Sequence, residues 1–88
     1  MRPFYNLQII TPHGIAYSTD AVHTLLPAED GFVGVLAHHA PYVTSVAGGR
    51  FEILEREGDT KKFRVGSGFF EVAKNQATLL VQSFKPQP

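Results

Sequence analysis

The chain has 88 residues, eight basic and eight acidic side chains, and no cysteine. This length predicts one domain over residues 1–88 with a thin core, for which a hydrophobic fraction of 43% is ample. The balanced charge argues against nucleic-acid binding, which needs a basic surface, and the absence of cysteine excludes disulfides and thiol nucleophiles. The N-terminal residues lack the apolar segment of a secretory signal, so a soluble intracellular protein is expected.

The sequence predicts short β-strands in which apolar and polar residues alternate. In residues 4–10, the side chains of Tyr5, Leu7 and Ile9 share one face. Further strands are predicted, in chain order, at residues 15–18, 21–26, 32–36, 42–47, 50–56, 61–65, 69–73 and 76–83. No amphipathic helix is predicted. About eight to ten short strands with Gly and Pro between them are typical of an antiparallel sandwich or barrel.

Residues 31–49 contain no Asp, Glu, Lys or Arg. Glycine pairs, a histidine pair and Pro41 interrupt this stretch, so it is not a membrane span. Two interpretations stay open: buried core strands joined by a corner, or strands that also form a docking face, because interface centres are depleted of charge. Within the stretch, Gly34 predicts a bulge or a close backbone approach. Gly48 and Gly49 predict a two-residue hairpin turn into the next strand.

No group of residues indicates an active site. Adjacent histidines on a strand point apart, so His38 and His39 are poor co-ligands, and with His13 and His23 distant in sequence no metal site is expected. The segment 66–68, Gly-Ser-Gly, has neither the spacing nor the following helix of a nucleophile elbow, and it is interpreted as a turn or bulge. No phosphate-binding glycine pattern precedes a helix, and no cofactor is expected.

The order of the motifs is more specific than any one of them. Residues 29–36 read Glu-Asp-Gly-Phe-Val-Gly-Val-Leu, and residues 39–44 read His-Ala-Pro-Tyr-Val-Thr. Together they resemble the signature of the ε subunit of F-type ATP synthases. Other segments match the remaining strands of that family in the same order, namely residues 7–12, 49–53, 63–72 and 77–81. The resemblance covers essentially the whole chain.

The resemblance implies a flattened antiparallel β-sandwich of about ten short strands in two sheets. It further implies a non-catalytic rotor subunit of the central stalk, without a cofactor, that binds the γ subunit and rests on the c-ring. Such a subunit couples proton-driven rotation to ATP synthesis at other subunits. Its expected location is the cytoplasmic face of a bacterial membrane, or alternatively the stromal side of a thylakoid membrane. It would touch the membrane only through the complex and be a monomer when isolated.

Carried over by position, the resemblance places Thr11, His39 and Thr44 near the γ subunit. The candidate c-ring-facing loop consists of Glu29, Asp30, Gly31 and Phe32. Several relatives have an acidic residue at the position of Phe32, which is interpreted either as an apolar contact to the ring or as a core residue. Residues 37–38, Ala-His, stand where the family commonly has Pro-Gly, so the conformation of this corner is open.

Most members of the family continue into two C-terminal helices that can restrain ATP hydrolysis. The sequence ends at Pro88, so we expect a short form that couples without a helical hairpin. An alternative from a different class is a free-standing β-sandwich that binds a sugar or peptide through exposed Tyr5, Tyr17 and Tyr42. A small histidine-based metalloenzyme is the third hypothesis.

Overall fold

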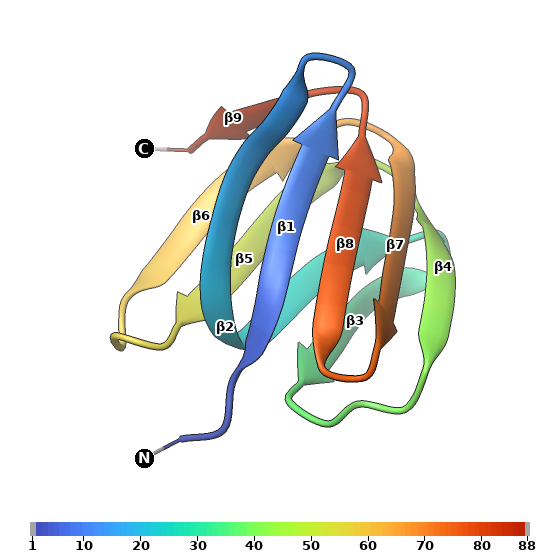
Figure 1. Cartoon of the computed structure of the whole chain (residues 1–88). Coiled ribbons are helices and arrows are strands. Elements are labelled where there is room, and N and C mark those ends of the chain that lie inside the picture. The colour runs from blue at the N-terminus through green and yellow to red at the C-terminus, as the bar shows by residue number, and fades with distance from the viewer. Residues whose placement is uncertain (1, 88) are drawn as a thin grey trace.

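A computed structural model describes residues 2–87, and these residues form β-strands and no helix (Figure 1). In chain order the strands are β1 (Tyr5–Thr11), β2 (Gly14–Ala28), β3 (Gly31–Leu36), β4 (Tyr42–Val46), β5 (Gly49–Glu55), β6 (Thr60–Val65), β7 (Gly68–Ala73), β8 (Gln76–Val81) and β9 (Phe84–Pro86). The predicted all-β fold is confirmed. Among the described residues, none lies in a helix long and apolar enough to cross a membrane.

Strand β2 is 15 residues long and belongs to both layers of the fold. Its first half pairs with β1, and its second half pairs with β3 and β5. One layer therefore runs in the order β2-β1-β8-β7-β4 and the other in the order β3-β2-β5-β6-β9 (Figure 1). We call them the first and the second sheet. They meet again where Ala28 of β2 pairs with Val46 of β4.

Two features of the pairing differ from the prediction. The segments predicted separately at residues 15–18 and 21–26 form one strand, because Asp20 stays paired with Asn6 of β1. Strands β1 and β8 run parallel, whereas the other strand pairs of residues 2–87 are antiparallel. Alternation in a sequence shows which residues share a face, but it does not show which strand lies alongside or in which direction.

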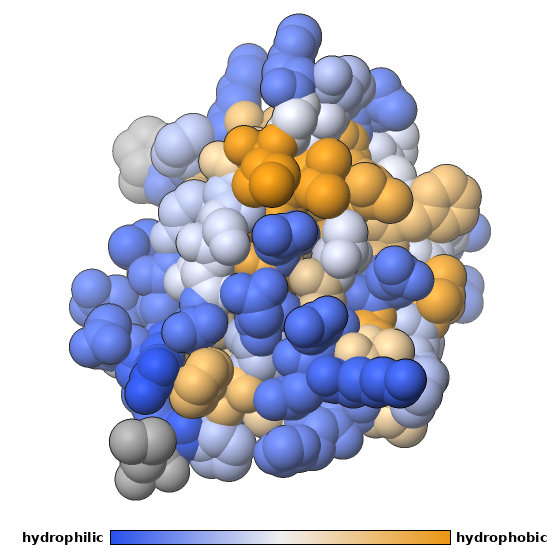
Figure 2. Space-filling model, in the orientation of Figure 1, coloured by the Kyte–Doolittle hydropathy of each residue, from blue (hydrophilic) through white to orange (hydrophobic). Residues whose placement is uncertain are grey.

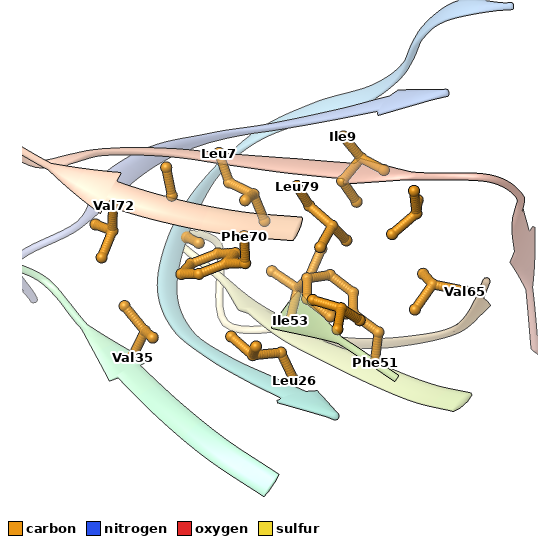
Figure 3. Close-up of a cluster of buried hydrophobic side chains, with 14 of the residues drawn as sticks. Leu7, Ile9, Leu26, Val35, Phe51, Ile53, Val65, Phe70, Val72 and Leu79 are labelled. Atoms are coloured by element: carbon orange, nitrogen blue, oxygen red, sulfur yellow. The ribbon is translucent and has the colours of Figure 1, made fainter. Parts of the chain in front are cut away.

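The core fills the space between the two sheets. Figure 3 shows Leu7 and Ile9 of β1 and Phe70 of β7 pointing toward the residues of β5, Phe51 and Ile53. Each of these side chains has an exposed fraction of 0%. Full burial of an apolar side chain of this size contributes about 1.5–3 kcal/mol. The alternate residues of the two sheets therefore supply the main stabilisation, as the alternation in residues 4–10 predicted.

The predicted hairpin turn at Gly48 and Gly49 is wrong. Strand β4 pairs with β7, whereas β5 pairs with β2 and β6, so these glycines carry the chain from the first sheet to the second. Their φ angles are 87° and 135°, a region that glycine adopts without steric cost. The glycine pair therefore indicates the local backbone conformation correctly, but it serves a crossover.

The segment 66–68, interpreted from the sequence as a turn or bulge, instead carries the chain from β6 in the second sheet to β7 in the first. The amide of Gly66 donates to the carbonyl of Ser83 at 3.0 Å, and the carbonyl of Ser67 accepts from the amide of Gln82 at 3.1 Å. A Cβ atom at Gly68 would lie 1.8 Å from the carbonyl oxygen of Leu80. The glycines in this segment therefore allow two chains to lie close together, which is a structural role.

Tyr17 closes the side of the sandwich that lies away from β4. Its ring is 5.3 Å from the ring of Phe63 in β6 and 6.0 Å from that of Phe84 in β9. Its hydroxyl donates to the carboxylate of Glu55, and the ammonium of Lys61 lies 3.0 Å from the other carboxylate oxygen. Tyr17 of β2 thus contacts the second sheet both by aromatic packing and by a hydrogen bond to a carboxylate.

The contact between Tyr17 and Glu55 shifts the pKa of both side chains. Burial acts to raise the pKa of Glu55, but hydrogen bonds from Tyr17, Lys61 and Thr19 outweigh burial, so the pKa lies below its usual value. Burial and the contact with Glu55 raise the pKa of Tyr17. The charged carboxylate is therefore the form that the folded protein favours.

We expect Glu55 to contribute to acid denaturation. Its folded-state pKa is lowered, so its stabilising effect is complete above the pKa of the unfolded carboxyl and is lost as pH falls through the folded-state value. Glu55→Gln should therefore give a flatter loss of unfolding free energy below about pH 5 than the wild type, measured by urea unfolding. Glu57→Gln, in the exposed turn of the same hairpin, is the control. Parallel profiles for Glu55→Gln and the wild type would contradict this role.

Candidate docking surface

Exposed apolar side chains form a row across the outer face of the first sheet. Strand pairing sets Ile15 opposite Ile10, Ile10 beside Leu80, and Leu80 opposite Phe69. The exposed fractions are 63% for Ile15, 45% for Leu80 and 60% for Phe69, and Val43 of β4 extends the row at 67%. Figure 2 shows hydrophobic surface gathered over the upper parts of β1, β8 and β7. We call these five residues the apolar row.

The apolar row arises from pairs of consecutive apolar residues in three strands. Residues 9–10 in β1, 69–70 in β7 and 79–80 in β8 are all apolar. Successive side chains of a strand point to opposite faces, so one residue of each pair enters the core and the other faces outward. Because β1, β8 and β7 are neighbours, the outward residues come together. Sequence analysis missed this surface, although the doubled residues were a usable signal.

Two shallow hollows flank the ridge formed by Phe69 and Leu80. One is lined also by Ile10, Thr11, Pro12 and Val81, and the other by Val43, Glu71 and Thr78. The remaining outer face of the first sheet is largely polar and borders the apolar row along one side (Figure 2). An apolar patch with a polar border is typical of a protein-docking surface.

The structure separates the three residues predicted to lie near the γ subunit. Thr11 ends β1 and lines one of the hollows beside the apolar row. Thr44 of β4 is paired with the buried Phe70, so it lies on the inner face of the sheet, and its hydroxyl donates to the carbonyl of Ser45 at 3.2 Å. His39 precedes β4, which runs in the same direction as β1, so His39 and Thr11 lie at opposite ends of the sheet.

The predicted c-ring-facing loop is the tip of the hairpin between β2 and β3. Glu29, Asp30 and Gly31 are exposed, and Gly31 has a φ of 123°. Phe32 is 53% exposed, so its interpretation as a core residue is wrong. The guanidinium of Arg50 lies 5.5 Å from the centre of the Phe32 ring. The tip thus presents two carboxylates beside an exposed aromatic ring.

The interpretation of the charge-free stretch as core strands is confirmed for some of its residues, and its interpretation as a docking face stays a prediction. Val35 and Val46 are buried in the core, whereas Leu36 and Val43 are 58% and 67% exposed. Gly34 allows a close approach by a side chain, because its missing Cβ would lie 2.9 Å from Nε2 of His23. Strands β3 and β4 each lie at an edge of their sheet, which explains why they have both core and exposed apolar residues.

The structure gives no support to the metal and ligand-binding hypotheses. Within residues 2–87, no three His, Asp or Glu side chains come together as a metal site. Tyr5 is only 1% exposed, its hydroxyl donates to the carbonyl of Val35 at 3.1 Å, and burial raises its pKa to about 12. Tyr17 lies between the sheets and Tyr42 is half-buried. The expectation that these three tyrosines are exposed is therefore wrong.

A family profile described as "ATP synthase, Delta/Epsilon chain, beta-sandwich domain" matches residues 4–87. The chain belongs to this family. An ATP synthase epsilon chain of Natranaerobius thermophilus is 36% identical over 83 residues, which are 93% of this chain and 59% of that relative. One from Pelotomaculum thermopropionicum is 39% identical over 77 residues, 88% of this chain and 57% of the relative. The chain thus spans less than two thirds of the length of these relatives.

Two solved structures share the fold. One is the Euglena gracilis mitochondrial ATP synthase in an OSCP/F1/c-ring structure, with a TM-score of 0.89, 19% identity, and coverage of 98% of this chain and 56% of that chain. The other is the central stalk and c-ring structure of the Tetrahymena thermophila mitochondrial ATP synthase, with a TM-score of 0.76, 12% identity, and coverage of 98% and 69%. At these identities the two similarities show a shared fold alone, in agreement with the strand arrangement described above.

The corner at residues 37–38 keeps the backbone form that a glycine would adopt. His38 has a φ of 64°, in the left-handed region that glycine adopts more easily than a residue with a side chain. Because this chain has Ala-His where the family commonly has Pro-Gly, His38 holds a strained backbone conformation at this corner.

His38→Gly should raise the unfolding free energy by about 0.5–1 kcal/mol, because glycine relieves the steric cost of the left-handed region. Urea unfolding at neutral pH measures the change. Ala37→Gly is the matched control, and it should lower the stability because Ala37 packs against the core and its φ is not in the positive range. A His38→Gly protein that is no more stable than the wild type would show that the corner is not strained.

Proposed function

We propose that this chain is the β-sandwich of a non-catalytic rotor subunit in the central stalk of a proton-translocating ATP synthase. In this role it joins the γ subunit to the c-ring and couples rotation to ATP synthesis. Membership of the ATP synthase delta/epsilon family supports the proposal. The observation that carries it is the apolar row, because a folded domain that exposes such a surface gains from a partner that covers it.

The apolar row is the proposed contact with the γ subunit. The hollows beside Phe69 and Leu80 can receive apolar side chains of a partner, and Glu71 at the border favours a basic group there. Strands β7 and β8 have six residues each and so span about 20 Å. One partner lying along the outer face of the first sheet can therefore contact the apolar row at one end and the loop of His39 at the other.

The tip of the β2–β3 hairpin is the proposed contact with the c-ring. Glu29 and Asp30 are exposed there, and Phe32 adds an apolar contact that the acidic residue of several relatives would not provide. The tip and the apolar row share no residue, so the two proposed contacts do not compete for the same side chains. The proposed location is the cytoplasmic face of a bacterial membrane, with attachment only through the complex.

Replacing both ridge residues, Phe69→Thr with Leu80→Thr, should weaken binding to the γ subunit of the same organism about 30- to 100-fold. Both side chains are already exposed, and Thr suits a strand, so the fold should be kept while apolar contact area is lost. Titration calorimetry measures the affinity. The control is Phe32→Thr, which removes a similarly exposed apolar side chain from the second sheet.

A third variant, His39→Glu, tests a position carried over from the family, and Thr44 is left unchanged because it lies on the inner face of the sheet. Equal binding by the wild type and the ridge variant would show that the apolar row is not the contact. A wild-type chain that does not bind the γ subunit would contradict the proposed function itself.

A further inference from the structure

Asn75 lies at the tip of the hairpin between β7 and β8. Lys74 and Asn75 form the two-residue connection, with φ angles of 51° and 62°. Positive φ at both positions is the geometry of a type I′ turn, for which Asn is well suited. The turn fixes the direction of the Asn75 side chain, because the strands on both sides of it are paired from Gly68–Val81 to Ala73–Gln76.

Both ends of the Asn75 side-chain amide bind backbone groups of distant segments. Its Oδ1 accepts from the amide of His38 at 2.8 Å, and its Nδ2 donates to the carbonyl of Phe4 at 2.7 Å. The carbonyl of Asn75 also accepts from the amide of Asn6 at 3.3 Å. One residue thus joins the β7–β8 turn, the β3–β4 loop and the start of β1.

The bond to His38 acts at the point where the β3–β4 loop is strained. His38 holds a φ of 64°, and its amide would lose a protein partner without Asn75. The next residue, His39, has its amide 3.3 Å from the carbonyl of Leu36, and its ring lies 5.6 Å from that of Tyr42. The position of the His39 ring therefore depends on a backbone conformation that Asn75 stabilises from another hairpin.

We propose that Asn75 is the positioning residue for the docking loop of residues 37–41. It holds the backbone of His38, and through it the ring of His39, in the conformation that meets the γ subunit. Asn75 acts through its amide oxygen and not by touching the partner. This inference rests on the proposed function, because it assigns His39 to the docking surface.

Three variants distinguish the effect of the two side-chain hydrogen bonds of Asn75 from the effect of the turn conformation. Asn75→Gly allows positive φ and removes both side-chain bonds. Asn75→Asp keeps an acceptor for the amide of His38 and removes the donor to Phe4. Lys74→Gly is the matched control, since Lys74 occupies the same turn with positive φ. Each full-length chain is titrated with the γ subunit of the same organism, and amide exchange of His38 and the ring resonances of His39 are followed by NMR.

We expect Asn75→Gly to weaken binding about tenfold, to speed amide exchange at His38 and to shift the His39 ring signals. Asn75→Asp and Lys74→Gly should bind within about threefold of the wild type and keep the His39 signals. If Asn75→Gly binds like Lys74→Gly, or if Asn75→Asp is as weak as Asn75→Gly, the positioning role is overturned while the proposed function stands. If the wild type does not bind the γ subunit, both are overturned.

Discussion

Strand β2 is the element on which both sheets depend, because its pairing continues from β1 in the first sheet to β3 and β5 in the second. A single strand that crosses between layers in this way joins the two sheets around one core. Leu26 of β2 enters the shared core, and Tyr17 of the same strand binds Glu55 across the open side of the sandwich. The two outer faces, on which partners can bind, lie on either side of the core that this strand spans.

The sequence predicted the alternation of buried residues well, because the side-chain period of a strand is set by local geometry. It did not predict neighbours: Gly48 and Gly49 make a crossover instead of a hairpin, and β1 lies parallel to β8. Those facts depend on contacts between segments distant in sequence. For the same reason the apolar row was missed, since its members come together only when β1, β8 and β7 are adjacent. Motif order indicated the family without needing the pairing.

The proposed function depends on exposed surfaces that partners can cover. The apolar row exposes apolar surface whose burial by a partner is favourable. The β2–β3 tip offers carboxylates beside the exposed ring of Phe32. The loop of His39 is held by Asn75 from a different hairpin. A rigid sandwich would suit the proposed rotor role, because that role requires torque to pass between partners without deformation of the subunit. The hydrogen-bonded ties at Asn75 and at Glu55 supply rigidity where the sheets are open.

The most direct test of the account is a photocrosslink in the assembled ATP synthase of the same organism. A photoreactive amino acid replaces Leu80, in the apolar row, or Phe32, which is similarly exposed on the second sheet. The account predicts a covalent adduct with the γ subunit from position 80 and none from position 32. An adduct with the γ subunit from position 32 alone, or from neither position in an assembled enzyme, would contradict it.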